Sequence, residues 1–238
     1  MPQDSHPAGL TTRNYIRITS PPVLRFLFVL LLQFVTMAFL EKKSYFWIVD
    51  AALFSLLFVF GAAIVLENRK LRARGIALVV LAIGAKWVGK WFPGIMANEL
   101  ALVAGVLFMG ILAWSFLRYI LLAPHIDARI LYASVATYLI LGFCWALAYE
   151  LLAGAVPDAF AYTVGPETTH SMQGFRGLYF SFITLSTVGY GDIVPVSNGA
   201  RLLAMLEATS GVFYVAMVVA RIVAIYTMTN PREGNGGD

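Results

Sequence analysis

Five consecutive residues near the end of the chain have the types and spacing to bind a metal cation that has lost its water: Thr187, Val188, Gly189, Tyr190 and Gly191. A ring of oxygen atoms must replace the lost hydration, and backbone carbonyls form one when successive residues turn them toward one axis. Residues with side chains resist that backbone conformation, whereas glycine accepts it. The two glycines alternate with residues whose side chains can pack outward and brace the loop. The pattern indicates a cation site, with a glycine-rich hairpin turn as the alternative.

The apolar segment directly before this loop must position it. Residues 175–186, directly before it, are apolar and aromatic but only about 12 residues long. About 20 residues are needed to cross the roughly 30 Å hydrocarbon core of a membrane. The short segment is therefore predicted to be a re-entrant helix, which enters and leaves the membrane on one side. A hairpin turn alone does not account for such a segment.

The composition places the chain in a membrane. Its 238 residues are 60% hydrophobic and only 13% charged, whereas a soluble domain has about 25% charged residues. The apolar runs long enough to span are residues 22–40, 46–66, 75–92, 98–122, 130–153 and 199–228. The predicted fold class is an all-α integral membrane protein. It has six transmembrane helices, with the re-entrant helix and the loop between the fifth and the sixth.

The charged and reactive residues argue against nucleic-acid binding and against catalysis. The net charge is +4, but the basic residues cluster at the ends of the predicted spans, as membrane topology requires. Cys144 is the single cysteine, so no intrachain disulfide or cysteine metal site can form. The sequence contains no His/Cys metal cluster, phosphate-binding glycine loop or nucleophile–base motif. We therefore expect no enzyme, no organic cofactor and no nucleic-acid partner.

The lysines and arginines predict the orientation. With the N-terminus inside, eleven of them fall on the cytoplasmic side and six on the outer side. Cytoplasmic loops carry the positive excess, so both termini are expected in the cytoplasm of a multi-pass protein of the plasma (inner) membrane. The strongest determinant is a cluster that could also bind anionic lipid headgroups, namely Arg69, Lys70, Arg72 and Arg74. This orientation places the loop of residues 187–191 at the outer face.

The stretch from Thr184 to Asp192 resembles the pore loop of potassium channels, and residues 193–195 follow it in the order that this family uses. The whole chain resembles the six-transmembrane, one-pore-loop potassium channels of the voltage-gated-like superfamily, in their bacterial form. The resemblance implies a potassium-selective channel subunit that conducts K⁺ passively, with the permeant K⁺ as its bound ion. A less selective cation channel is an alternative, which Tyr190 argues against. A silent or regulatory subunit of another channel is a second.

By this resemblance, the selectivity filter is formed by residues 187–191. The K⁺ sites are the backbone carbonyls of Thr187, Val188, Gly189 and Tyr190, together with the Thr187 hydroxyl. One chain carries one loop, whereas the ring of carbonyls needs four. The resemblance therefore implies a homotetramer with fourfold symmetry, surrounded by membrane lipids. A separate regulatory subunit is left open.

Two residues are expected to support the filter. Tyr179 occupies the first position of an aromatic pair that the family carries behind the filter, and Asp192 follows the filter. The resemblance implies a hydrogen bond between their side chains. The family sometimes has a carboxylate four residues before the filter threonine, but this chain has Ile183 there. The family's inactivation behaviour therefore does not carry over.

The last predicted helix continues the resemblance. Gly211 lies 20 residues after Gly191, at the spacing of the family's gating-hinge glycine. Glycine inside a helix costs about 1 kcal/mol relative to alanine, which suits either a bending point or close packing behind the pore helix. One face beyond this glycine is a candidate lining for an apolar inner gate, formed by Val215, Val219, Ile222 and Val223.

The first four helices resemble a voltage-sensor domain that lacks its charges. Sensor helices carry several arginines through the field, whereas residues 100–122 contain only Arg118. Steep voltage gating is therefore not expected. Asp50 and Lys86 are predicted to lie at similar depth and to form an intramembrane ion pair. The alternative is that the lysine extends separately to the outer surface.

The predicted organisation has four parts. Residues 1–21 form a cytoplasmic N-terminal segment, and residues 22–123 form the peripheral four-helix domain. Residues 129–228 form the pore domain, and residues 229–238 form a short cytoplasmic tail. The link between the two membrane domains is so short that we expect the peripheral helices to pack on the pore of their own subunit.

Overall fold

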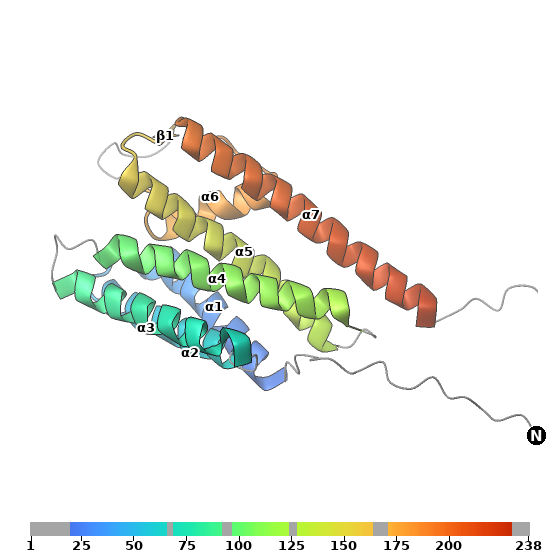
Figure 1. The fold of residues 1–238 in the computed structure, drawn as a ribbon. Coiled ribbons are helices and arrows are strands. Elements are labelled where there is room, and N and C mark those ends of the chain that lie inside the picture. Colours follow the sequence, from blue (N-terminus) through green and yellow to red (C-terminus); the bar gives the residue numbers. More distant parts are fainter. Residues whose placement is uncertain (1–19, 66–68, 92–96, 124–127, 164–170, 230–238) are drawn as a thin grey trace, which may run out of the picture.

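The structure is a computed structural model that describes residues 20–65, 69–91, 97–123, 128–163 and 171–229. The predicted terminal segments, residues 1–21 and 229–238, lie almost entirely outside the described residues. Figure 1 shows the elements, which are α1 (Ser20–Leu40), α2 (Phe46–Val65), α3 (Arg69–Trp91), α4 (Ala97–Leu122), α5 (Ala128–Ala155), β1 (Phe160–Tyr162), α6 (Phe175–Leu185), β2 (Ile193–Pro195) and α7 (Asn198–Thr229).

Within the described residues, five helices are long and apolar enough to cross a membrane: α1, α2, α4, α5 and α7. The remaining long helix, α3, has an apolar part of only Gly75–Gly89. Basic residues occupy its beginning and lysines lie near its end, and these lower its hydropathy. At about 1.5 Å per residue, its 23 residues are still as long as a bilayer core. The sixth span therefore stays a prediction.

A small sheet, which we did not predict from the sequence, departs from the all-α expectation. Strands β1 and β2 pair antiparallel, with Ala161 opposite Val194. They connect the segment after α5 to the segment after the loop of residues 187–191. The backbone N–H of Thr163 extends the pairing by donating to the carbonyl of Asp192 at 2.9 Å. The exit of the loop is thus attached to the end of α5.

The helices form two groups that meet along α5 (Figure 1). Helices α1 to α4 lie on one side, and the short α6 and the long α7 lie on the other. Helix α4 packs against α5 of the same chain, and α1 also contacts α5 and α6. The core between α2 and α4 is aromatic, with the rings of Phe58 and Phe108 stacked at a centroid distance of 4.6 Å.

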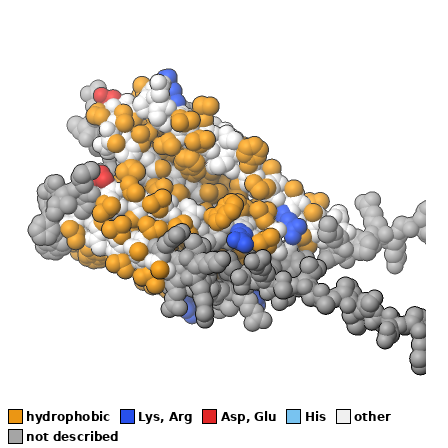
Figure 2. Space-filling model, viewed as in Figure 1, with side chains coloured by type: hydrophobic (Ala, Val, Ile, Leu, Met, Phe, Trp, Pro, Cys, Tyr) orange, Lys and Arg blue, Asp and Glu red, His pale blue; other side chains and the backbone are white. Residues whose placement is uncertain are grey.

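The outer surface of this fold is apolar. Figure 2 shows hydrophobic side chains over much of the described surface in that view. Helix α7 is the least covered, because only 22% of its spanning stretch is buried, against 44–56% in the other four. Its most exposed large side chains, each more than half exposed, are Leu202, Met205, Val212, Phe213, Val219 and Val223.

Candidate functional site

The loop of residues 187–191 has an alternating backbone. The φ angle is positive at every second residue, 59° at Thr187, 53° at Gly189 and 80° at Gly191. A β-branched residue such as threonine rarely adopts this region, so Thr187 is a true outlier. Alternation of left- and right-handed residues turns successive peptide groups the same way. The loop therefore has the kind of backbone that a column of carbonyl ligands requires.

Helix α6 holds the start of this loop. The N–H groups of Val188 and Gly189 both donate to the carbonyl of Ile183, at 2.8 and 3.2 Å. The N–H of Thr187 donates to the carbonyl of Thr184 at 2.9 Å. The loop thus begins at the C-terminus of α6, where the helix dipole places partial negative charge. This charge favours a cation nearby.

The side chains of Val188 and Tyr190 in this loop are largely exposed within the described part of the chain. Val188 is 52% exposed and Tyr190 is 72% exposed. The predicted outward bracing therefore has no partner in the described part of the chain.

The predicted support residues lie together behind the loop. Tyr179 and Asp192 interact through a side-chain hydrogen bond. The other carboxylate oxygen, Asp192 Oδ1, is buried without a hydrogen-bond partner among the described residues. The Thr163 hydroxyl adds contacts to the carbonyls of Gly191 and Asp192, at 3.3 and 3.2 Å. The end of the loop is therefore held both by α6 and by the strand segment.

Gly211 lies at the closest approach of α7 to α6. A Cβ atom there would be 2.2 Å from the carbonyl oxygen of Leu185, the last residue of α6. Such a contact is impossible without movement of the backbone, so only glycine fits. Of the two roles expected for this glycine, close packing is observed. The role of Gly211 as a bending point of α7 stays a prediction.

The four residues expected to line a gate do not share one environment. Val215, Val219 and Val223 are each at least half exposed on α7. Ile222 is half-buried and packs against the main hydrophobic core. Nearby, Arg221 Nη2 donates to the carbonyl of Ala123, just after α4, at 2.7 Å. The three valines therefore form the exposed face, and Ile222 belongs to the interior.

The structure brings Asp50 and Lys86 together. Lys86 Nζ lies 2.9 Å from Asp50 Oδ2. The other oxygen of Asp50 accepts a hydrogen bond from Gln33 Nε2 at 2.5 Å, and Lys86 also lies 5.2 Å from the ring centroid of Phe54. This small network joins α1, α2 and α3 at one depth.

Two carboxylates lie at the N-terminus of α6, and neither was predicted to act there. Glu41 accepts a hydrogen bond from the backbone of Phe175, and Glu150 accepts one from Gly174. Burial raises the pKa of the Glu41 carboxyl, while this hydrogen bond and Arg176 act in the opposite direction. Negative groups are stabilising at a helix N-terminus. The first turn of α6 is thus held by Glu41, which follows α1, and by Glu150, which lies in the last two turns of α5.

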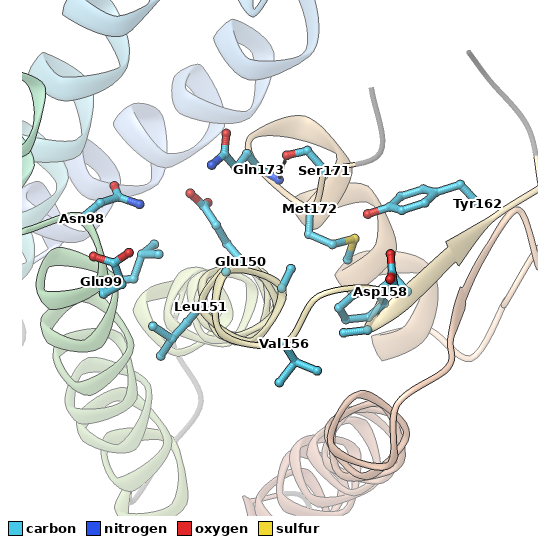
Figure 3. A pocket seen from close by; sticks show the side chains of 15 residues that line it. Asn98, Glu99, Glu150, Leu151, Val156, Asp158, Tyr162, Ser171, Met172 and Gln173 are labelled. Atoms are coloured by element: carbon cyan, nitrogen blue, oxygen red, sulfur yellow. Dashed lines mark hydrogen bonds between the residues drawn. The ribbon is translucent and has the colours of Figure 1, made fainter. Parts of the chain in front are cut away.

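Glu150 also lines a cavity of about 290 Å³ beside α5. Figure 3 shows its carboxylate in the space between Asn98 and Gln173. Further lining residues include Glu99, Asp158 and Tyr162. In the described residues, no group of three or more His, Cys, Asp or Glu side chains could hold a metal ion.

A third functional candidate was missed from the sequence. Glu207 lies in α7, and its side chain is fully buried. There it forms hydrogen bonds with Tyr149 and Ser181. The sequence contains a signal for this residue, because an acidic residue stands inside an apolar run of 28 residues. Acidic residues within membrane spans are rare and commonly functional. Its partners lie 58 and 26 positions away, and only the fold identifies them.

The α5–α7 part of the chain matches a known family of proteins. Residues 135–228 match the family model described as ion channel. The match covers most of α5, all of α6, the loop with alternating φ and nearly all of α7. It is a family of channels, not of enzymes. Together with five candidate spans, the match makes the chain a multi-pass membrane protein.

Curated relatives of the chain are potassium channels by name. The chain is similar to the calcium-gated potassium channel TvoK of Thermoplasma volcanium, with 46% identity over 50 residues, which is 21% of this chain and 14% of the relative. It is also similar to two-pore potassium channel 4 of Arabidopsis thaliana, with 38% identity over 60 residues, 25% of this chain and 20% of the relative.

A third similarity is to potassium voltage-gated channel subfamily A member 7 of Mus musculus, with 32% identity over 68 residues, 29% of this chain and 14% of the relative. The chain thus spans 14–20% of the length of these three relatives. No solved structure matches the chain significantly.

Proposed function

We propose that this chain is the subunit of a potassium-selective channel that conducts K⁺ passively through residues 187–191. The observation that carries the proposal is the positive φ at Thr187, Gly189 and Gly191, in a loop that leaves the C-terminus of a short helix. The carbonyls of residues 187–190 and the Thr187 hydroxyl replace the hydration of K⁺. The names of the relatives support K⁺ as the ion.

The proposed assembly is a homotetramer in the plasma (inner) membrane. One loop supplies one quarter of a fourfold ring. The exposure of Val188 and Tyr190 and the sparse burial of α7 support neighbouring subunits on these surfaces. Six spans in each subunit, with α3 as the third, place both termini in the cytoplasm. The peripheral domain is residues 22–123 and the pore domain is residues 129–228.

Gating does not depend steeply on voltage in this proposal. Arg118 is the only Lys or Arg residue in α4, so this helix carries too little charge to move in the field. The gate is the narrowing of α7 helices at Val215, Val219 and Val223, whose exposed apolar faces close by dewetting. Gly211 lies between this gate and the filter. Tyr179 and Asp192 brace the filter from behind.

The first test is ion flux in liposomes that contain the purified protein. Potassium flux should exceed sodium flux many-fold, and barium should block it. Gly189→Ala and Gly110→Ala form a matched pair, because neither added Cβ meets an atom within 4 Å, but only Gly189 has a positive φ. Alanine is strained at such a φ, so we expect Gly189→Ala to lose selective flux and Gly110→Ala to keep it.

Two outcomes would contradict the proposal. Equal potassium and sodium flux would exclude a selective filter at residues 187–191. Absence of flux from a verified tetramer, across lipid compositions and pH, would exclude a conducting homotetramer.

A further inference from the structure

The carboxyl group of Glu207 is enclosed where three helices meet. The residue is 0% exposed in α7, one helical turn before Gly211. Its Oε2 atom accepts a hydrogen bond from the Tyr149 hydroxyl on α5, and its Oε1 atom lies 2.5 Å from Ser181 Oγ on α6. Ser181 precedes the filter threonine by six positions. A single side chain therefore connects both neighbouring spans with the pore helix.

The number of available protons determines how these contacts can form. Ser181 Oγ lies 2.6 Å from the carbonyl oxygen of Gly142 as well as 2.5 Å from Glu207 Oε1. A serine hydroxyl has one proton to donate, and a carbonyl oxygen can only accept. If Ser181 donates to Gly142, the contact with Glu207 needs a proton from the carboxyl group. When Glu207 is protonated, each of the three contacts has its own proton: Tyr149 donates to Glu207, Glu207 donates to Ser181, and Ser181 donates to Gly142.

Within the part of the chain that the structure describes, no cationic group lies near Glu207 to compensate a negative charge. The titratable side chains that face it are Tyr138, Cys144 and Tyr149, all on α5. Helix α6 contributes the hydroxyl of Ser181. Among the described residues, no lysine, arginine or histidine acts on Glu207. A buried ionised carboxylate without a cationic partner is costly, whereas a hydrogen-bonded neutral acid is not.

We propose that Glu207 is a neutral carboxylic acid and a positioning residue for the filter. It donates its proton to Ser181, accepts one from Tyr149, and so fixes α6 between α5 and α7. The inference rests on the proposed function of residues 187–191 as an ion filter. Loss of the Glu207 proton to a base in alkaline solution leaves Ser181 with two acceptors and one proton. One contact of α6 must then separate, and the filter loses its support.

The expected behaviour is a proton-dependent channel. Potassium flux should fall several-fold from neutral to strongly alkaline pH on both sides of the membrane, and the selectivity over sodium should fall with it. Glu207→Gln keeps the shape of the side chain and can donate to Ser181 without titrating. Its ratio of alkaline to neutral flux should therefore stay near one. Glu99→Gln, at an exposed acid of α4, serves as the control and should keep the wild-type pH profile.

An infrared measurement tests the protonation without relying on ion flux. The carbonyl stretch of a protonated carboxylic acid should be present at neutral pH in the wild-type protein and absent in Glu207→Gln. A wild-type pH profile in Glu207→Gln, or the absence of this band from the wild-type protein, would overturn the inference. If the protein carries no flux but has the band, the filter proposal fails while the protonated Glu207 stands.

Discussion

Single residues in and near the loop of residues 187–191 accept conformations and contacts that other residue types would not. Thr187 holds a positive φ of 59° although its side chain is β-branched. Backbone strain of this kind costs on the order of 1–3 kcal/mol and persists only where surrounding contacts enforce it. Here the enforcing contacts are the hydrogen bonds of the next two residues to Ile183. At Gly211 the constraint is steric, because a carbonyl oxygen occupies the place of a Cβ atom.

The steric constraint at Gly211 gives a test that separates packing from helix propensity. Gly84→Ala, where the added Cβ meets nothing within 4 Å, should stabilise the protein by up to about 1 kcal/mol through helix propensity. Gly211→Ala has the same gain but forces α7 away from Leu185, so it should cost about 1–3 kcal/mol net. Thermal unfolding of the purified protein measures both. Equal melting temperatures for the two variants would show that the close approach is absent.

Among the elements, α6 is held at both ends by other helices. Its N-terminus binds Glu41 and Glu150, its middle binds Glu207 through Ser181, and its C-terminus touches Gly211. The ion pair of Asp50 and Lys86 lies near Glu150, which also feels the charge of Lys86. The ion pair thus acts electrostatically on Glu150, whose carboxylate accepts a hydrogen bond at the N-terminus of α6.

The ion pair can be tested by exchanging its charges. Asp50→Lys or Lys86→Asp alone leaves like charges side by side at a site where the side chain of residue 50 is buried, and an uncompensated buried charge is strongly destabilising. The double exchange restores attraction, and Gln33 Oε1, which has no hydrogen-bond partner among the described residues, can then accept from the new lysine. We expect low yields of folded protein for each single variant and recovery in the double variant. No recovery would mean that the pair is not coupled.

The elements also mark the limit of prediction from the sequence. Hydropathy predicted the ends of the long helices within two residues, except the start of α3, which lies six residues before the predicted residue 75. The similar depth expected for Asp50 and Lys86 in neighbouring helices predicted their ion pair. Strands β1 and β2 have three residues each, too few for an alternating pattern to be recognised. The contacts of Glu207 join residues far apart in the sequence. Both features arise from tertiary packing, which local patterns do not contain.

At the scale of the whole molecule, α7 presents an apolar surface that its own chain leaves open. The proposed tetramer assigns part of this surface to the conduction path. Val219 is 54% exposed and its neighbour Val218 is 8% exposed, so these adjacent residues lie on different faces of one helix. This difference provides a matched pair of positions for chemical modification.

In a chain with Cys144→Ala, the only native thiol is removed. A charged thiol reagent on the cytoplasmic side should then reduce potassium flux at least tenfold in Val219→Cys and leave Val218→Cys unaffected. The reason is that a bulky charged group in an apolar constriction blocks ions. Equal modification at both positions, or modification of Val219→Cys without loss of flux, would place the conduction path elsewhere.

The open surfaces of α7 and of Val188 and Tyr190 have a consequence for assembly. Burial in lipid gives little drive for helices to associate, because lipid is as apolar as the helices. In the proposed tetramer the ring of carbonyls exists only when four chains assemble. An ion that binds this ring therefore stabilises the assembled state by mass action, in addition to helix packing. The fraction of subunits that are assembled into tetramers should therefore rise with the concentration of the permeant ion as well as with the density of subunits in the bilayer. In the proposed tetramer the transported ion is also a structural component of the oligomer.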